Sequence, residues 1–503
     1  MDRFADEGEL ASVLGDWTEG PGPLYQKLVD ALRRVIAEGE LLPGFLLPSE
    51  RRLARALEVS RATVVAAYDL LRDEGMLSRK VGSGTRVHPS VRALQRARPA
   101  QVPHGGATAL MRRLVDGPGR VISLTTADSG LDIANDLACA MLEVIDDLPA
   151  LLSDSGYHPR GLSALREALA RHHSGQGPPT TADEIVVTTG ATQSLVLIAQ
   201  MYVTRGSIVV VESPSWPGCL DVFRAAGAEL VAVPMDEDGV RPDLLADTVA
   251  TLGPALIYLM PNYHNPTGAL MPKTRRRQVA QIAARYGVPL VEDCATGLSG
   301  EMPAPIAAFA PERAEVLTLG SLGKTVWSGL RLGWTRAPAA VAGVLAGYKA
   351  LADMGSSLLP QAVATSLMPR LTELAAERAA AQRIRREALE ELLREQLPDW
   401  RWRSPAGGSA LWIELPGVNA QIFAQVALQH GVEVVPGALA DPSGRHDSYI
   451  RLPCTFSAEA MVAVVRKLAG AWARLSERSS NSAGLSAGTM TSGSRLDGRP
   501  GVA

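Results

Sequence analysis

The sequence predicts an α/β protein made of a small N-terminal domain and a much larger domain with a mainly parallel sheet. The chain has 503 residues, well beyond the length at which one hydrophobic core stops growing. Apolar residues recur at helical spacing in residues 24–75. Beyond residue 120, strand-length apolar runs alternate with helical patterns, as they do where helices join parallel strands. Residues 89–120 are rich in Pro and Gly, which is typical of a linker.

The composition is that of a folded protein without a membrane span. Hydrophobic residues make up 46% and charged residues 20% of the chain, which argues against a disordered or collagen-like protein. No apolar run approaches the roughly 20 residues of a membrane-spanning helix, and the N-terminus lacks the pattern of a signal peptide. We therefore expect a cytoplasmic protein. The cysteines are too widely spaced for structural zinc and are expected to be reduced thiols: Cys139, Cys219, Cys294 and Cys454.

The small domain is expected to span residues 23–88. The spacing of apolar residues predicts a first helix over residues 24–38. Ser49 and Ser60 are suited to cap a second and a third helix, because a serine hydroxyl can accept a backbone N–H there. Two short apolar stretches in residues 76–87, around glycines, predict a hairpin. Three helices followed by a hairpin form a winged helix-turn-helix.

The segments that flank the two domains differ in charge and composition. Residues 1–22, an N-terminal extension, hold six acidic residues and one basic residue, whereas the linker of residues 89–120 holds six Arg and one Asp. The basic stretch is compatible with an anionic partner or with a solvated linker. Residues 478–503 are rich in Ser, Gly and Thr, so we expect a disordered tail.

The large domain is expected to span residues 121–477. Its strand-length runs alternate with helical patterns, which predicts a mainly parallel sheet covered by helices. Residues after about 400 suggest a smaller α+β unit. The expected strands of the sheet are residues 185–188, 208–212, 230–233, 256–260, 289–292 and 316–319, and those of the smaller unit are 411–415, 432–435 and 449–452.

Three motifs in the small domain resemble the GntR family of winged-helix repressors. They are residues 47–54 (LPSERRLA), residues 59–64 (VSRATV) and residues 70–75 (LLRDEG). The resemblance implies double-stranded operator DNA as a partner, with the first turn of the third helix facing base edges and phosphates. The alternative is that these arginines form a solvated helix face and the domain binds protein. The residues expected at the DNA are Ser49, Arg51, Ser60, Arg61, Thr63, Arg79, Lys80 and Gly82.

A lysine in the large domain has the surroundings of a Schiff-base lysine. Residues 321–324 (SLGK) and 329–333 (GLRLG) resemble the lysine segment of fold-type I aminotransferases. The resemblance implies that Lys324 carries pyridoxal 5'-phosphate (PLP) as an internal aldimine. It also implies that Ser321 and Arg331 lie beside the phosphate, where a hydroxyl and a guanidinium can bind a dianion. Without such support, an exposed lysine on a turn would be the default interpretation.

Three further segments resemble the parts of that family that hold the cofactor ring. Asn265, in residues 262–268 (NYHNPTG), corresponds to the hydrogen-bond donor to the phenolic oxygen. Asp293 ends a strand where a carboxylate keeps the pyridine nitrogen protonated, and Trp216 corresponds to the aromatic that stacks on the ring. Many relatives have a Tyr where this chain has Ala295, so Asn265 is expected to be the only close side-chain donor.

The remaining segments concern the phosphate and the ligand. Gly190, Ala191 and Thr192 stand between a strand and a helix, where backbone N–H groups surround an anion. The resemblance implies that Tyr157 reaches the phosphate of the neighbouring subunit and that Arg451 clamps a substrate carboxylate.

A GntR-like winged helix joined to an aminotransferase-like domain is the arrangement of the MocR subfamily. The resemblance implies a transcription regulator that binds PLP and senses an amine, an amino acid or PLP itself. It also implies a homodimer in which each DNA-binding domain lies across the partner subunit. Two alternatives remain: a working aminotransferase with an accessory DNA-binding domain, and a binding protein with a relict site. We expect at most residual transamination, and no metal site.

Overall fold

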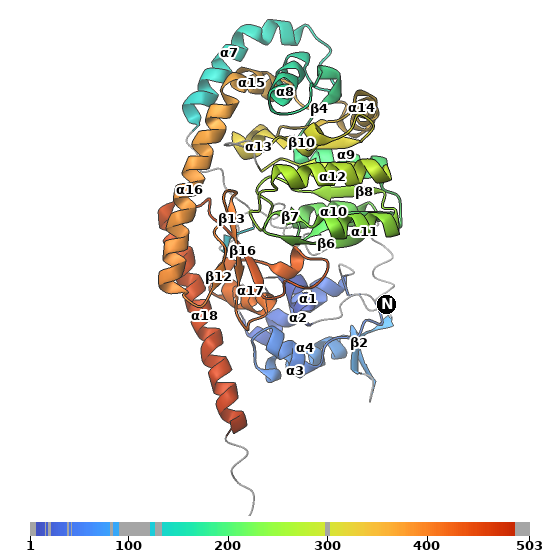
Figure 1. The fold of residues 1–503 in the computed structure, drawn as a ribbon. Helices are drawn as coiled ribbons and strands as arrows, with labels where there is room; N and C mark the ends of the chain where they lie inside the picture. Colours follow the sequence, from blue (N-terminus) through green and yellow to red (C-terminus); the bar gives the residue numbers. More distant parts are fainter. Residues whose placement is uncertain are drawn as a thin grey trace, which may run out of the picture.

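The computed structural model shows three packed units (Figure 1): the winged helix, a large α/β domain and a small α+β domain. The last two together form the aminotransferase-like part, so the predicted fold class is confirmed. The structure describes residues 7–15, 17–18, 22–37, 40–41, 43–80, 84–89, 121–125, 133–296 and 302–487.

The winged helix has the three helices and the hairpin that the sequence predicts. Ser49 accepts the backbone N–H of Arg52 at 3.4 Å, and Ser60 accepts that of Thr63 at 3.1 Å, so both serines cap helices as expected. The apolar faces of the helices share one core with the hairpin. Its elements are α2 (Leu24–Ala37), α3 (Glu50–Ala56), α4 (Arg61–Asp73), β1 (Leu77–Lys80) and β2 (Gly84–Val87).

Part of the predicted N-terminal extension belongs to this domain. Residues Glu7–Leu14 form α1, and Leu10 and Leu14 are fully buried in the winged-helix core. The same helix also contacts α17 (Ala420–Gln429) of the small domain, where Gln425 Nε2 donates to the carbonyl of Ala11 at 3.0 Å. Leu10 and Leu14 lie on the same face of α1, which packs on the winged helix. The folded N-terminal domain therefore begins before residue 23.

The large domain is an eight-stranded mixed sheet with helices on both faces (Figure 1). Its order is β4-β11-β10-β9-β8-β5-β6-β7, and among these described strands only β7 and β11 run antiparallel to their neighbours. The mainly parallel sheet is thus confirmed. The strands are β4 (Ile185–Thr188), β5 (Ile208–Ser213), β6 (Glu229–Asp236), β7 (Gly239–Val240), β8 (Leu256–Leu259), β9 (Leu290–Asp293), β10 (Val316–Ser321) and β11 (Gly333–Arg336).

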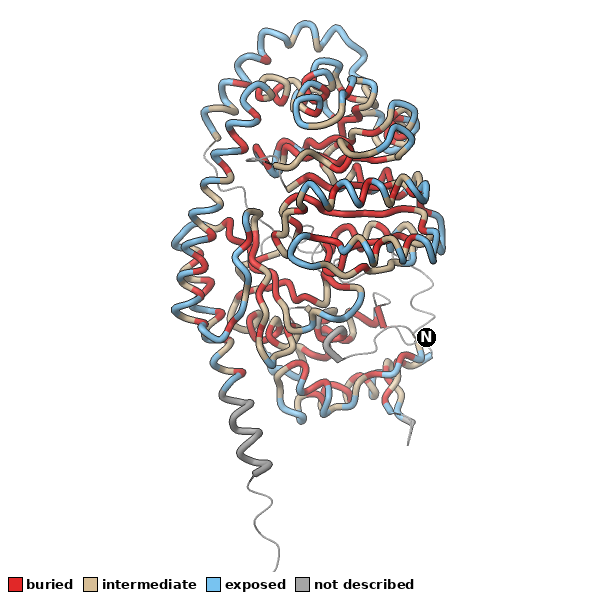
Figure 2. Tube along the Cα trace, in the orientation of Figure 1, coloured by how far each residue is buried: buried red, intermediate tan, exposed pale blue. Residues whose placement is uncertain are grey.

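Alternate side chains of the central strands enter two cores, one on each face of the sheet. Val209 and Val211 of β5 lie in one core, and Val210 lies in the other. Figure 2 shows these central strands as almost continuously buried. The helices of this domain are α7 (Ala134–Leu152), α8 (Ser163–Gln176), α9 (Ala191–Tyr202), α10 (Pro217–Ala225), α11 (Pro242–Leu252), α12 (Lys273–Tyr286), α13 (Leu322–Thr325), α14 (Ala339–Asp353) and α15 (Leu358–Leu367).

A long helix, α16 (Leu371–Gln396), connects the two aminotransferase-like domains (Figure 1). Leu371 near its start belongs to a core of the large domain, and Leu393 near its end belongs to the core of the small domain. The small domain has an antiparallel sheet in the order β12-β13-β16-β15 and a separate parallel pair, β3 and β14. Its elements are β3 (Ile122–Ser123), β12 (Arg401–Trp402), β13 (Ala410–Glu414), β14 (Val432–Glu433), β15 (Val435–Pro436), β16 (Tyr449–Pro453), α17 and α18 (Ala458–Ala487).

The last helix continues past the predicted end of the folded domain. Helix α18 runs to Ala487, so the expected disorder of residues 478–487 is replaced by helix, which propagates from the packed part of α18. Residues 488–503 lie outside the described residues, as do residues 90–120 of the linker. None of the helices in the described ranges combines the length and apolarity that crossing a membrane requires.

Candidate functional site

Lys324 lies at the carboxyl edge of the large sheet. Strand β10 ends at Ser321, which is 7% exposed, and α13 begins at the next residue and carries Lys324. Lys324 is exposed to solvent on one side, although many protein atoms lie close to its amine. Desolvation by these atoms lowers the pKa of Lys324 to about 8, helped by the charges of Arg451 and Arg378 and opposed by Asp293.

Asp293 faces the same edge of the sheet from the adjacent strand. β9 and β10 pair in parallel with Asp293 opposite Leu319, which places the carboxylate near the end of β10. The Tyr258 hydroxyl donates to Oδ2 at 2.6 Å, and the N–H of Ala295 donates to Oδ1 at 2.9 Å. Burial raises the pKa of Asp293, while these hydrogen bonds and Lys324 act in the opposite direction. The two donors fix the orientation of a buried carboxylate.

Gly190 and Arg331 form a cradle suited to a phosphate. Gly190 has a φ of 136° and caps the N-terminus of α9, so the backbone N–H groups of the first turn point outward there. A Cβ placed on Gly190 would lie 3.4 Å from Nη2 of Arg331. The guanidinium therefore lies beside the helix N-terminus, and a side chain larger than glycine would enter the space between them. Thr192 is exposed in the same first turn, next to Ala191.

Arg451 and Asn265 join the small domain to the large one. Arg451 Nε donates to Oδ1 of Asn265 at 3.1 Å, and Arg451 Nη1 lies 3.5 Å from the carbonyl oxygen of Thr125. Since the Asn265 oxygen is engaged, its amide nitrogen is the part that can donate to a ligand. Burial lowers the pKa of Arg451 to about 10, so the guanidinium remains cationic at neutral pH.

Two other predicted residues lie at different places. Trp216 is half-buried and directly precedes α10. Its carbonyl accepts from the Cys219 thiol, whose pKa is raised by burial and also by the nearby Asp293 carboxylate. Tyr157 is 64% exposed on the connection between α7 and α8. Within one chain Tyr157 is thus a surface residue, whereas Trp216 shares the neighbourhood of Asp293.

Two residues of this site were not predicted from the sequence. Tyr258 lies in the apolar strand β8, where a tyrosine is typical of core, and only the pairing of β8 with β9 brings its hydroxyl to Asp293. Arg378 lies on α16, is 6% exposed and donates to the carbonyl of Val326, two residues after Lys324, at 3.2 Å. The sequence carries no signal for either contact.

The residues at this edge fit PLP. The N-terminus of α9 with Arg331 suits a dianionic phosphate, and the oriented carboxylate of Asp293 suits a protonated ring nitrogen. Lys324 with its lowered pKa suits attachment to an aldehyde, because the neutral amine is the form that reacts.

The winged helix presents its expected residues at capped helix N-termini. Arg51 and Arg61 are exposed in the first turns of α3 and α4, and Thr63 contacts the Ser60 hydroxyl at 2.8 Å. Arg79 is exposed on β1, opposite Thr85 of β2. The side chain of Lys80 and the whole of Gly82 lie outside the described residues.

Comparisons with known proteins cover both parts of the chain. Residues 131–468 match aminotransferase class I and II, and residues 24–87 match the gntR family of bacterial regulatory proteins. The chain is 31% identical over 453 residues to the HTH-type transcriptional regulator YisV of Bacillus subtilis, covering 86% of this chain and 93% of that protein. It is 30% identical over 372 residues to the HTH-type pyridoxine biosynthesis transcriptional regulator PdxR of Corynebacterium glutamicum, covering 73% and 76% respectively.

A solved structure shows the same aminotransferase fold with a cofactor derivative. LysN, an α-aminoadipate aminotransferase from Thermus thermophilus complexed with N-(5'-phosphopyridoxyl)-L-leucine, matches with a TM-score of 0.65 and 26% identity. The match covers 73% of this chain and 94% of that chain. The large and small domains are therefore those of a PLP-dependent aminotransferase fold, and with its N-terminal domain the chain belongs to the GntR-family transcriptional regulators that carry a class I and II aminotransferase domain, the MocR subfamily.

Proposed function

We propose that this regulator holds PLP at Lys324 and changes its DNA contacts when an amine or amino acid binds beside the cofactor. The observation that carries the proposal is the meeting of Lys324, Asp293 and the Arg451–Asn265 pair at one sheet edge, in a chain that also has a winged helix. Sensing of PLP itself is the other form of the same function.

Each residue has a defined task. PLP, when bound, supplies an electrophilic carbon and an electron-withdrawing ring. Lys324 provides an amine that is partly neutral near pH 8, and Asp293 holds a proton at the ring nitrogen. We assign Arg451 to a ligand carboxylate, and the amide N–H of its partner Asn265 to the phenolic oxygen.

Other residues are assigned to the phosphate and to the ring face of PLP. We assign the phosphate to the first turn of α9, from Gly190 through Ala191 and Thr192, with Ser321 and Arg331. Trp216 is assigned to the ring face. The exposed Tyr157 is assigned to the phosphate of the partner subunit.

The DNA contact is assigned to the first turns of α3 and α4 and to the wing. We assign Ser60, Arg61 and Thr63 to base edges, because the N-terminal residues of a recognition helix make such contacts and these three lie at the start of α4. Ser49 and Arg51, at the start of α3, are a second contact, and the hairpin residues Arg79, Lys80 and Gly82 are assigned to the wing contact with the duplex. Because DNA is the partner, the protein would act in the cytoplasm.

A homodimer is supported by an apolar face of α7. Met141, Leu142, Ile145 and Leu152 are between 56% and 76% exposed there, and such a group of large apolar side chains is typical of a protein interface. A second copy is the occupant expected for an aminotransferase-like domain. In the single chain, α1 contacts α17 of the same molecule. The crossed arrangement, in which this contact is made between two copies, stays a prediction.

The function can be tested by measuring DNA affinity with and without amino acids. Purified protein should be titrated onto the intergenic DNA recovered with it by immunoprecipitation, in the presence of single amino acids. We expect at least one to change the dissociation constant in the native protein and not in Lys324→Ala. An affinity that no amino acid or PLP changes would contradict the proposal.

The alternative function, aminotransfer, is favoured by the retention of Lys324, Asp293, Asn265 and Arg451. Steady turnover of an amino acid with a 2-oxo acid, at a rate typical of enzymes, would support it. We expect residual turnover only.

A further inference from the structure

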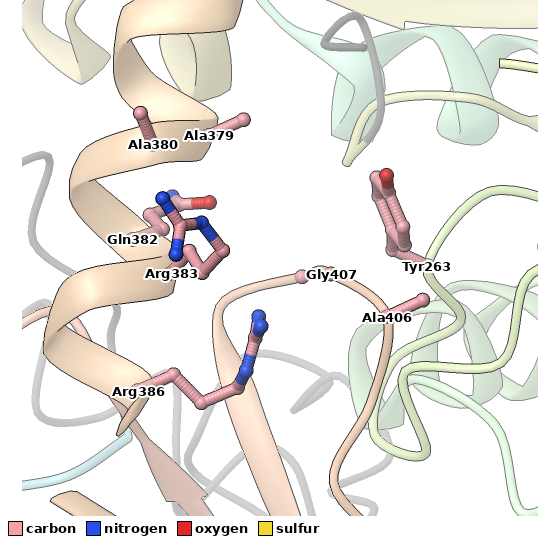
Figure 3. Close-up of a pocket in the computed structure, with 9 residues that line it drawn as sticks. Tyr263, Ala379, Ala380, Gln382, Arg383, Arg386, Ala406 and Gly407 are labelled. Carbon is pink, nitrogen blue, oxygen red and sulfur yellow. The ribbon is translucent and has the colours of Figure 1, made fainter. Parts of the chain in front are cut away.

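A cavity lies beside the cofactor site, between the two aminotransferase-like domains. It has a volume of about 260 Å³ and is bounded by α16, by the loop between β12 and β13, and by Tyr263 (Figure 3). Gln382, Arg383 and Arg386 contribute from the helix, and Gly407 contributes from the loop. Among the described residues that line it there is no carboxylate. The cavity therefore carries two guanidinium groups, and the described lining offers them no acidic group.

Arg386 is buried with an incompletely satisfied charge. Its side chain is 8% exposed, and its Nε has no hydrogen-bond partner among the described residues. The nearest carboxylate is Glu390, whose Oε1 is 3.9 Å from Nε. That carboxylate already accepts from Arg394 at 2.7 Å and from Ser404 at 2.6 Å. A buried cation that has to share its nearest acid is costly unless an anion completes the site.

Arg383 lies one helical turn earlier, at the outer side of the cavity. Its side chain is 58% exposed and pairs with Glu387 of the same helix at 3.2 Å. An exposed pair of this kind contributes little, so its guanidinium can reorient toward an anion at low cost. Figure 3 shows both arginines extending from α16 on the side opposite Tyr263.

The cavity is close to the residues that would hold the ligand. A second, narrower cavity shares Tyr263 and Gly408 with it and is also lined by Asn265, the partner of Arg451. Arg386 and Arg451 also lie near one thiol, Cys454, whose pKa burial raises to about 11 while both guanidiniums act in the opposite direction. Both guanidinium groups are therefore close to the same small-domain residue.

We propose that this cavity is an anion subsite that binds the distal carboxylate of the effector, which is then an amino acid with two acidic groups. The inference rests on the proposed function, because it takes the α-carboxylate to bind Arg451. Arg386 holds the distal carboxylate with its planar donor groups, and Arg383 covers it from the solvent side. Tyr263 and the adjoining glycines form the opposite wall. Gly407 is needed there because a Cβ at this position would collide with the Tyr263 ring.

The test compares ligands that differ only in the distal group. The PLP-loaded protein is titrated with L-glutamate and L-glutamine, and with L-2-aminoadipate and L-norleucine, while the visible absorbance of the cofactor is recorded. At least one acid of these pairs should bind about tenfold or more tightly than its neutral partner. Arg386→Gln should bring the ratio of the two dissociation constants close to one, and Arg386→Lys should retain part of it.

A matched control is available one residue away. Arg385→Gln removes the same charge from α16, but the Arg385 guanidinium donates to the carbonyl of Thr455 and does not line the cavity. It should keep the full preference. Arg383→Gln, on the exposed side, provides a second variant in case Arg386→Gln does not fold, and should reduce the preference. Thermal unfolding of each variant reports on folding.

The outcomes separate the subsite from the proposed function. Equal binding of the acidic and neutral amino acids by the native protein would overturn the subsite, as would a full preference in Arg386→Gln. If no amino acid changes the cofactor absorbance or the affinity for DNA, the amino-acid form of the proposed function fails. In that case, Arg386-dependent thermal stabilisation by glutarate but not by inorganic phosphate would still support a carboxylate site. Equal stabilisation by both would mean a site for free anions and would overturn the proposal.

Discussion

The proposed cofactor site and the proposed DNA-binding face are built in opposite ways. The residues around Lys324 come from β8, β9, α13, α16 and β16, and several of their polar groups are buried. The residues assigned to DNA lie within residues 49–82, and Arg51, Arg61 and Arg79 among them are exposed. A site assembled from distant segments depends on tertiary packing, whereas a local site depends mainly on capping and charge. Substitutions should therefore have different signatures in the two regions.

The largest effect is expected at Lys324. Lys324→Ala should abolish the visible band of bound PLP and its trapping by borohydride, because no other amine is expected to attach the cofactor. Mass spectrometry of the reduced protein locates the adduct. The exposed Lys273→Ala serves as the control and should trap normally. Trapping that persists in Lys324→Ala would place the attachment at another lysine.

The next largest effect is expected at Asp293 and its hydrogen-bond partner Tyr258, which should differ in how much each contributes to PLP binding. Asp293→Asn should weaken PLP binding by tenfold or more, since a hydrogen bond to a charged group contributes about 1.5–3 kcal/mol. Tyr258→Phe keeps the carboxylate and loses one donor, so a smaller loss of about 0.5–1.5 kcal/mol is expected. Equilibrium dialysis with PLP measures both. A larger loss in Tyr258→Phe would show that the tyrosine has a role beyond orienting Asp293.

In the winged helix, replacing Arg61 should affect sequence preference, whereas replacing Arg51 or Arg79 should affect DNA affinity in general. Arg61→Ala should reduce the preference for cognate over scrambled duplex by about 1–3 kcal/mol, the value of one base-reading arginine. Arg51→Ala and Arg79→Ala should weaken both duplexes and flatten the salt dependence by about one unit. Titrations over a salt series measure these quantities. An unchanged preference in Arg61→Ala would refute its base-reading role, and cofactor absorbance should be the same in all three.

A moderate effect is expected at Ala295. A tyrosine there can donate to the phenolic oxygen and stabilise its fully charged form, which is the unprotonated form of the attached cofactor. Ala295→Tyr should therefore lower the pH at which the absorbance shifts, by roughly one unit. Ala295 is only 8% exposed, so the variant is informative if its thermal unfolding matches that of the native protein. A titration without any shift, or with an upward one, would mean that another side chain fills this role.

The smallest effect concerns the pH dependence of cofactor attachment. The pKa of Lys324 is about 8, below its usual value, so the amine is neutral above this pH and protonated below it. The initial rate at which PLP attaches to cofactor-free protein should rise with pH, with a midpoint near 8. Arg378→Gln removes a charge that lowers the pKa and should move the midpoint upward. A midpoint that is unchanged or moves downward would contradict this electrostatic assignment.

The sequence predicts most of the fold because its signals are local. The strand runs match the sheet, and Ser49 and Ser60 cap the helices that their positions indicate. Helix α1 was not predicted, because a helix of eight residues shows only a weak apolar periodicity. It is stabilised by packing on the winged helix.

At the cofactor site, the motif residues could be identified but not their partners. Tyr258 looks like an ordinary strand residue, and Arg378 and Arg386 look like the solvated face of a helix. Their contacts arise from strand register and from the path of α16 between two domains, which no local pattern contains. The charges that shift the pKa of Lys324 therefore become visible only in three dimensions.

The small domain touches both ends of the regulator. Through Arg451 it meets Asn265 at the cofactor site, and through Gln425 and Gln429 of α17 it donates to the carbonyls of Ala11 and Leu57 in the winged helix. Because the same domain contacts both sites, effector and operator binding can be coupled through it, and any such coupling is reciprocal. Whatever factor an effector imposes on operator affinity, the operator must impose on effector affinity, so the promoter-bound protein would respond at a different effector concentration from the free protein.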